Sequence, residues 1–227
     1  MTKRGIWTLV GLAVVAVTAV LLVLFTGSSD DANPEPTATY VIALDPGHGG
    51  SDPGATVDEV YEKDLNLEIA AKVAALLEAD PTYAVVRTRT LDVSVSLEDR
   101  IATAENAGAI VYVSVHVNAF STSEAYGVET LVDSTRDASD DSWVLAELIQ
   151  DGVVQATGAR DRGTRAQESY LQRTALPAVS VETGYLTNDE ERVLLLDSAY
   201  QELIAQGIVQ GIRAFVALRY GETGSET

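Results

Sequence analysis

Beyond residue 40, the chain alternates between short apolar runs and segments whose apolar residues recur at helical spacing. The apolar runs are rich in valine and isoleucine and are bounded by Gly, Pro, Asp or Asn, which is typical of strands. They predict strands at residues 40–44, 83–88, 109–115, 127–132 and 178–181. Helix-spaced stripes and capping residues predict helices at 65–77, 96–107, 142–156, from 188 onward and at 200–216. This alternation predicts a single α/β domain, with a mostly parallel sheet and helices on both faces.

The first 29 residues have a different pattern. Residues 6–25 are mostly Val, Leu and Ala, and about 20 apolar residues can cross the hydrocarbon core of a bilayer. Lys3 and Arg4 precede this stretch and acidic residues follow it, which predicts a cytoplasmic N-terminus and an exported remainder. We therefore expect a single-pass membrane anchor at residues 1–29. The alternative is a signal peptide whose cleavage would release the protein outside the cell.

Residues 30–39 are polar and contain two prolines, so we expect a spacer there. The catalytic domain is expected at residues 40–220 and a disordered tail at 221–227. Cysteine is absent, which excludes a thiol nucleophile and any cysteine-ligated metal. The chain has 34 acidic against 15 basic residues and a net charge of −19. This balance argues against nucleic acid as a partner, because phosphate binding requires clustered Lys and Arg.

The chain has only two histidines, and each follows a predicted strand. His48 lies in the segment Asp-Pro-Gly-His-Gly-Gly, and His116 directly follows the third apolar run. Since open α/β sheets place their sites at the carboxyl ends of strands, the two imidazoles are expected to share a site. Two imidazoles and one carboxylate are typical of zinc with a position left for water. Spacing alone leaves five candidates for the carboxylate, namely Asp52, Asp58, Glu59, Glu62 and Asp64.

A further carboxylate, Glu182, ends the last predicted strand. A buried charge must be paired, protonated or bound to metal, so Glu182 is interpreted as a general base near the metal. The alternative is an exposed strand end without a role. Asn118 could contact substrate or simply end its strand, and Tyr185 could line the pocket mouth or have no role there. Residues 161–163 are expected to form a turn into the site.

Five segments then occur in a fixed order: VIALDPGHGGSDPGA, YEKDLNLEIA, VSLEDRIATAENAGAIVYVSVHVNA, GVET and LPAVSVETGYLTNDEE. Together they closely resemble the zinc-dependent N-acetylmuramoyl-L-alanine amidases of bacterial cell walls, over residues 40–218. The resemblance implies that His48, Glu62 and His116 bind zinc and that Glu182 is the catalytic glutamate. The implied reaction is attack of metal-activated water on the amide between N-acetylmuramic acid and L-alanine in peptidoglycan.

Two other classes of function remain open at this stage. A non-catalytic wall-binding module could keep the fold and the metal, and a zinc peptidase or deacylase could use the same ligands on another amide. Some members of the resembled family carry an extra helix that plugs the zinc site until an activator binds. Here residues 133–141 are too short and too charged for such a helix. We therefore expect an open pocket and no obligatory protein activator.

Overall fold

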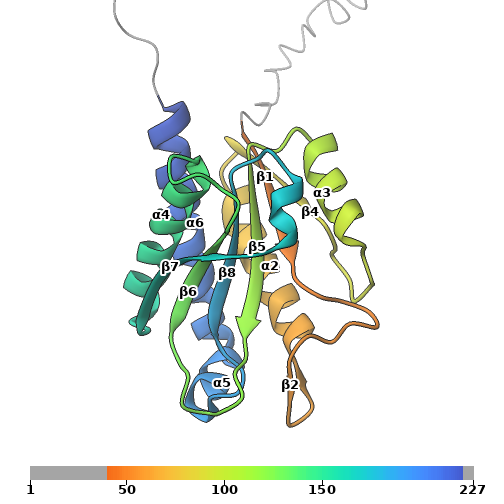
Figure 1. The fold of residues 1–227 in the computed structure, drawn as a ribbon, viewed down its shortest axis with the longest axis vertical. Coiled ribbons are helices and arrows are strands. Elements are labelled where there is room, and N and C mark those ends of the chain that lie inside the picture. Colours follow the sequence, from red (N-terminus) through yellow and green to blue (C-terminus); the bar gives the residue numbers. More distant parts are fainter. Residues whose placement is uncertain (1–39, 222–227) are drawn as a thin grey trace, which may run out of the picture. The chain divides into compact units, whose positions relative to one another are not determined.

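The computed structural model describes residues 40–221, which form a six-stranded mixed sheet between layers of helices (Figure 1). The strand order is β4-β1-β5-β8-β6-β7. The strands are β1 (Tyr40–Pro46), β4 (Tyr83–Arg87), β5 (Val111–Asn118), β6 (Val128–Asp133), β7 (Asp161–Gln167) and β8 (Ala178–Tyr185). Strands β4, β1, β5 and β8 run parallel, whereas β6 is antiparallel to β8 and parallel to β7. The prediction of a mostly parallel sheet is thus confirmed.

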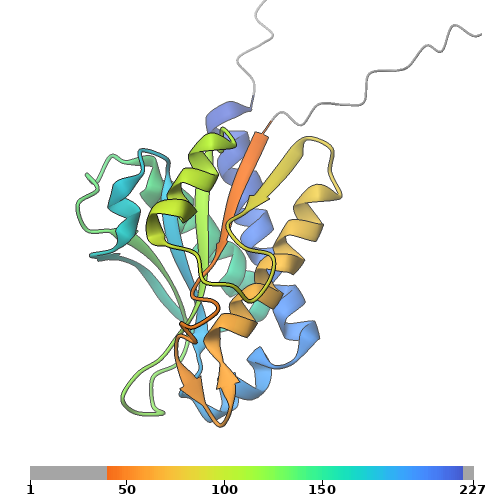
Figure 2. The ribbon, with the colours of Figure 1, turned by 90° about the vertical axis from the view of Figure 1, so that its right-hand side faces the viewer.

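Helices cover the two faces of this sheet unequally (Figures 1 and 2). The long helices α2 (Glu62–Glu78), α4 (Asp141–Thr157) and α6 (Ser198–Tyr220) share the larger core on one face. The shorter α3 (Leu97–Asn106) and the 3₁₀ helix η1 (Tyr170–Arg173) pack on the other face in a smaller core. Helix α5 (Asp189–Leu195) leads into α6. Helices on both faces match the prediction.

Side-chain alternation along the strands decides which residues meet on the second face. Val113 and Val115 of β5 belong to the core under the long helices, while Tyr112 belongs to the core under α3. Because successive side chains of a strand point to opposite faces, Ser114 and His116 lie on the same face as Tyr112. His116 is therefore carried on the face that only the shorter elements cover.

Two of the predicted helix starts are confirmed by their caps. The Ser96 hydroxyl accepts a hydrogen bond from the amide of Asp99 at the start of α3. The side chain of Asn188 accepts from the amides of Glu190 and Glu191 at the start of α5. Such caps satisfy backbone donors that have no partner inside the helix. They explain why these two boundaries can be read from the sequence.

One local prediction is wrong, and several short elements were not predicted. Residues 161–163, expected as a turn, are the first residues of strand β7, which lies at the edge of the sheet. The strand is mostly polar and partly exposed, so it has no apolar alternation, and its position depends on pairing with β6. Besides β7, the prediction lacked the 3₁₀ helix η1 and a short hairpin of β2 (Thr56–Val57) and β3 (Val60–Tyr61), which precedes α2.

The predicted anchor or signal segment at 1–29, the spacer at 30–39 and the tail from residue 222 lie outside the described residues. Among the helices of residues 40–221, none combines the length and the apolar character that a membrane crossing requires.

Candidate metal centre and catalytic site

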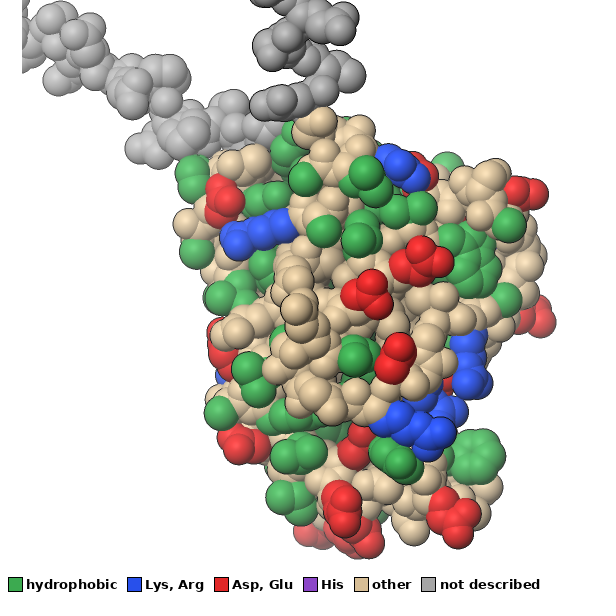
Figure 3. All heavy atoms as spheres, turned by 90° about the vertical axis from the view of Figure 1, so that its left-hand side faces the viewer, with side chains coloured by type: hydrophobic (Ala, Val, Ile, Leu, Met, Phe, Trp, Pro, Cys, Tyr) green, Lys and Arg blue, Asp and Glu red, His purple; other side chains and the backbone are tan. Residues whose placement is uncertain are grey.

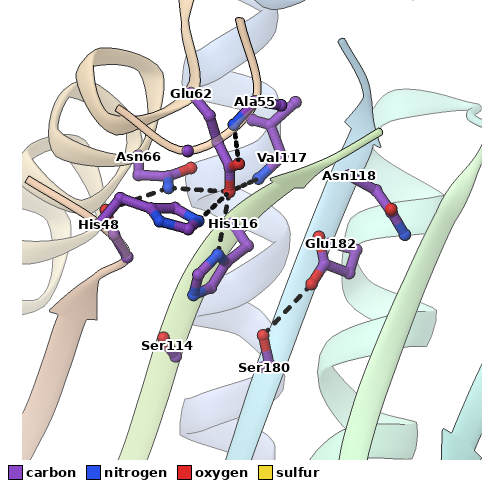
Figure 4. Close-up of polar contacts among 12 residues, drawn as sticks. His48, Ala55, Glu62, Asn66, Ser114, His116, Val117, Asn118, Ser180 and Glu182 are labelled. Atoms are coloured by element: carbon purple, nitrogen blue, oxygen red, sulfur yellow. Dashed lines mark hydrogen bonds and ion pairs between the residues drawn. The ribbon is translucent and has the colours of Figure 1, made fainter. Parts of the chain in front are cut away.

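The three predicted metal ligands converge near the carboxyl ends of the central strands β1 and β5 (Figure 4). The possible ligand atoms of His48, Glu62 and His116 all lie within 4.8 Å of one another. Glu62 Oε1 is 3.2 Å from His48 Nε2 and 2.9 Å from His116 Nδ1. Of the five carboxylates that spacing left open, Glu62 is thus the one between the two imidazoles. Asp52 contacts the other ring nitrogen of His48, at 2.8 Å.

Each of these side chains is set in place by its own backbone segment. His48 follows β1 in a left-handed conformation with φ of 61°, which is uncommon for a residue other than glycine. Glu62 is the first residue of α2, where a negative charge is favoured by the helix dipole. Its Oε2 accepts a hydrogen bond from the amide of Ala55 at 2.9 Å, and its Oε1 accepts one from Asn66 Nδ2 at 3.3 Å.

Two glycines allow the cluster to be this compact. A β-carbon on Gly47 would overlap the ring of His116. A β-carbon on Gly54 would lie 2.6 Å from Glu62 Oε2 and 2.7 Å from His48 Cδ2. Larger residues at either position would therefore push the proposed ligands apart.

The donor set fits a zinc ion that keeps an open coordination position. Two imidazoles and one carboxylate suit Zn²⁺, whereas Mg²⁺ and Ca²⁺ prefer oxygen ligands. The His48 and His116 side chains are 26% and 19% exposed, so a ligand can approach them. A cavity of about 450 Å³ opens beside both rings, between the end of β1, the start of α3 and Tyr170 of η1.

The hydrogen bonds among His48, Glu62 and His116 shift the pKa values of these groups. Burial raises the pKa of Glu62, but hydrogen bonds with His116 and His48 outweigh it and hold that pKa far below its usual range. The hydrogen bond to Glu62 raises the pKa of His48 to about 9. At neutral pH a metal ion must therefore displace a proton from this cluster when it binds.

Glu182 lies beside this cluster on the neighbouring strand β8. It is paired in register with His116 of β5, and it is 9% exposed. Burial raises the pKa of Glu182 to about 7. The charge of His116 acts to lower this pKa, but the charges of Glu62 and Glu129 act to raise it. The hydroxyl of Ser180 donates a long hydrogen bond of 3.5 Å to Glu182 Oε1 (Figure 4). Glu182 is thus a buried carboxylate, as predicted, and not an exposed strand end.

The sequence interpretation missed a second buried carboxylate at this site, Glu129 of β6. It is 5% exposed and paired in register with Glu182. Its Oε1 accepts hydrogen bonds from Asn118 Nδ2 at 2.9 Å and from the Tyr185 hydroxyl at 2.6 Å. Tyr185 is 3% exposed, so of the two interpretations of this residue the one at the pocket mouth does not hold. The GVET segment contained Glu129, but only the antiparallel pairing of β6 with β8 brings it to Glu182.

A buried ion pair supports the loop that carries His48. Asp45, at the end of β1, is fully buried, and Arg100 Nη1 donates to its Oδ1 at 2.6 Å. The Tyr170 hydroxyl donates to its Oδ2 at 2.5 Å. Arg100 also donates to the carbonyl oxygens of Pro46 and His48, at 2.9 and 2.6 Å. This arginine therefore connects α3 with the backbone on both sides of Gly47.

Comparisons with known proteins agree with this geometry. Residues 42–214 match the family described as N-acetylmuramoyl-L-alanine amidase. The N-acetylmuramoyl-L-alanine amidase LytC of Bacillus subtilis strain 168 is 36% identical over 177 residues, which cover 78% of this chain and 35% of LytC. The chain thus spans about a third of the length of that relative.

Solved structures resemble the whole described domain. An N-acetylmuramoyl-L-alanine amidase from Clostridium difficile 630 gives a TM-score of 0.77 at 37% identity, covering 81% of this chain and 100% of that one. The CwlD amidase from Clostridioides difficile was solved in complex with the GerS lipoprotein. It gives a TM-score of 0.73 at 32% identity, covering 79% of this chain and 99% of that one.

Proposed function

The chain belongs to the N-acetylmuramoyl-L-alanine amidase family, and from this premise we propose that it hydrolyses the amide between N-acetylmuramic acid and L-alanine in peptidoglycan. The proposal assigns a zinc ion to His48, Glu62 and His116 and makes Glu182 the general base. One observation carries it. Two imidazoles and a carboxylate converge at the edge of the sheet, and a buried carboxylate is paired with His116 on the next strand.

The bound zinc would supply a Lewis acid for the amide carbonyl and would lower the pKa of a coordinated water to about 7. The protein contributes a rigid, ionised ligand set. Glu62 is fixed by the amide of Ala55 and by Asn66. Asp52 contacts the second ring nitrogen of His48, and such outer partners orient ligating histidines.

Glu182 would take a proton from the attacking water and pass it to the leaving amine of L-alanine. Its position supports this role, because it lies on the same face of the sheet as His116 and one strand away. A pKa of about 7 would let it take up and release a proton near neutral pH. The route needs no nucleophilic side chain, which agrees with the absence of cysteine.

We further propose that the domain acts on the wall side of the cell membrane, tethered by residues 1–29. The support is the long uncharged stretch preceded by Lys3 and Arg4, together with a substrate that lies outside the cytoplasm. Release after signal cleavage is the alternative. Protease added to spheroplasts should digest the domain, and protection until lysis would contradict the proposed location.

For this chain we propose that no protein activator is obligatory, although the CwlD structure contains GerS. Between β6 and β8, the described chain forms α4, β7 and the four-residue η1. The apolar residues of α4 pack in the larger core, so this helix does not cover the histidines on the other face. The partial exposure of both histidines also fits a site that substrate can reach without prior opening.

The proposed chemistry is tested by metal removal and restoration on the full-length chain. Solubilisation of purified peptidoglycan should stop after dialysis against a chelator and return with about one equivalent of zinc per chain. The variant His116→Ala should hold less zinc and solubilise less peptidoglycan. Full activity of the metal-free protein, or a full zinc complement in that variant, would contradict the assignment.

A further inference from the structure

Building on the proposed function, we propose that Arg162 and Arg165 of β7 bind a carboxylate of the stem peptide close to the scissile amide. In peptidoglycan the second stem residue is a glutamate linked through its γ-carboxyl group, so its α-carboxyl is free unless it is amidated. The two arginines would make the enzyme prefer stem peptides that carry this free carboxylate.

Strand pairing places Arg165 on the same face of the sheet as His116 and Glu182. His116 is paired with Glu182, Glu182 with Glu129, and in the adjoining pair Leu131 of β6 with Arg165 of β7. Residues directly opposite each other on paired strands share a face of the sheet, and residues two apart on one strand do as well. His116, Glu182, Glu129 and Arg165 therefore follow one another across four strands on the same face.

The spacing of this row suits a peptide. Neighbouring strands lie about 4.8 Å apart, so β7 is about 10 Å from the strand that carries Glu182. An extended peptide advances about 3.4 Å per residue. A stem peptide whose first amide lies at Glu182 could therefore bring its second residue within reach of the arginine side chains.

Glu129 holds both arginines without using all their hydrogen-bonding groups. Arg165 Nε is 3.3 Å from Glu129 Oε2. Arg162 Nε is 3.5 Å from Glu129 Oε1 but makes no hydrogen bond. Arg162 also lies over the ring of Tyr185 at 5.0 Å and donates a weak bond of 3.4 Å to the Tyr126 carbonyl. Each guanidinium has five N–H groups, so most of them are free of partners within residues 40–221.

The ion pairing also leaves room for an acidic ligand. Within residues 40–221, Glu129 is the carboxylate within ion-pair distance of these two guanidinium groups, although Glu182 is paired with Glu129 on the next strand and Glu191 lies near Arg162. Arg165 is 54% exposed and Arg162 19% exposed. Lys and Arg side chains gather in a patch on the side of the molecule that carries α4 and β7 (Figure 3). In a chain with a net charge of −19, such a local patch can attract an acidic peptide that the rest of the surface repels.

The test compares two synthetic muramyl tripeptides that differ only in a free or an amidated α-carboxyl group at the second residue. Full-length wild-type protein in detergent should hydrolyse the free acid with a kcat/KM at least about 10-fold higher, since hydrogen bonds to charged groups are the stronger class. In Arg165→Gln this ratio should fall toward one, and in Arg162→Gln as well. Arg165 lies on an exposed edge strand, so its variant is expected to fold, which a melting curve will show.

The matched control is Arg160→Gln, because Arg160 lies over the Tyr126 ring at 4.8 Å and is not among the ion-pair partners of Glu129 within the described residues. This variant should keep the wild-type ratio. Equal kcat/KM values for the two substrates in the wild type, or an unchanged ratio in Arg165→Gln, would overturn the inference and leave the proposed function standing. Failure of the wild type to hydrolyse either substrate would count against the proposed function itself.

Discussion

His116 and Glu182 occupy paired positions on the neighbouring parallel strands β5 and β8. The pairing places an imidazole and a buried carboxylate on the same face of the sheet, next to Glu62 and His48. A possible metal ligand and a possible proton acceptor are thereby fixed relative to each other by backbone hydrogen bonds and not by flexible loops. This arrangement separates the roles of metal binding and proton transfer, which mutations can test independently.

Glu182→Gln should keep the fold and the zinc content but lose the reaction. Removal of a general base typically costs about 10²–10⁴-fold in rate, and the amide is close to the carboxylate in size. The measurements are zinc per chain, a melting curve and kcat on a muramyl peptide. Near-normal turnover by the zinc-loaded variant would rule out Glu182 as the base.

Gly47→Ala should lower the zinc content, because a β-carbon at this position overlaps the ring of His116. The matched control is Gly108→Ala, where a β-carbon meets nothing within 4 Å. Gly108 has a φ of +67°, so alanine there costs about 1–2 kcal/mol of backbone strain without a clash. We expect zinc loss and an activity loss only in Gly47→Ala. Equal zinc contents in the two variants would show that the packing against His116 does not position this ligand.

The buried pair of Asp45 and Arg100 should make stability depend on pH. Burial raises the pKa of Asp45, but the Arg100 charge and hydrogen bonds from Thr88 and Tyr170 outweigh it and hold that pKa below the usual 3.8. A carboxyl group with a lowered folded pKa stabilises the protein above its unfolded pKa, and this stabilisation is lost as pH falls through the folded value.

The wild type should therefore be more stable than Asp45→Asn by about 3–5 kcal/mol at neutral pH, the usual cost of breaking a buried ion pair. The difference should shrink as the pH falls below 3.8. Urea unfolding of both proteins from about pH 6 to about pH 2 measures it. A difference that stays constant over this range would mean that the pKa of Asp45 is the same in the folded and the unfolded protein. A difference that grows as the pH falls would mean that Asp45 is protonated in the folded protein.

A soluble fragment of residues 40–220 should cleave purified peptidoglycan without any added protein. The reason is that both histidines are partly exposed and border a cavity of about 450 Å³. The measurement is peptidoglycan solubilisation by the zinc-loaded fragment alone. A fragment that is folded and zinc-loaded, yet inactive until another protein is added, would contradict the open site.

The convergence of His48 and His116 could be predicted because it depends on local patterns. Each histidine lies at or just beyond the carboxyl end of an apolar run, and parallel strands bring these ends together on one side of the sheet. The choice among five acidic residues for the third position could not be made from spacing. It depends on the β2–β3 hairpin, which places the start of α2, and hence Glu62, beside both imidazoles.

The contacts of Glu129 with Asn118, Tyr185, Arg162 and Arg165 could not be predicted for a different reason. These residues come from β5, β8 and β7, and their proximity to Glu129 of β6 depends on the strand order and on one antiparallel pairing. Strand β7 has no apolar alternation that would identify it as a strand. The burial of Tyr185 was not predicted because the strand β8 continues to that residue, four residues beyond the apolar run that predicted it.

The central claim, cleavage of one particular amide, is tested most directly by identifying the new chemical groups that the zinc-loaded protein produces from purified peptidoglycan. We predict new free α-amino groups on L-alanine, muramic acid residues that keep an unsubstituted lactyl carboxyl group, and neither product from the metal-free protein. New reducing sugar ends, or new amino groups on residues other than that alanine, would contradict the account.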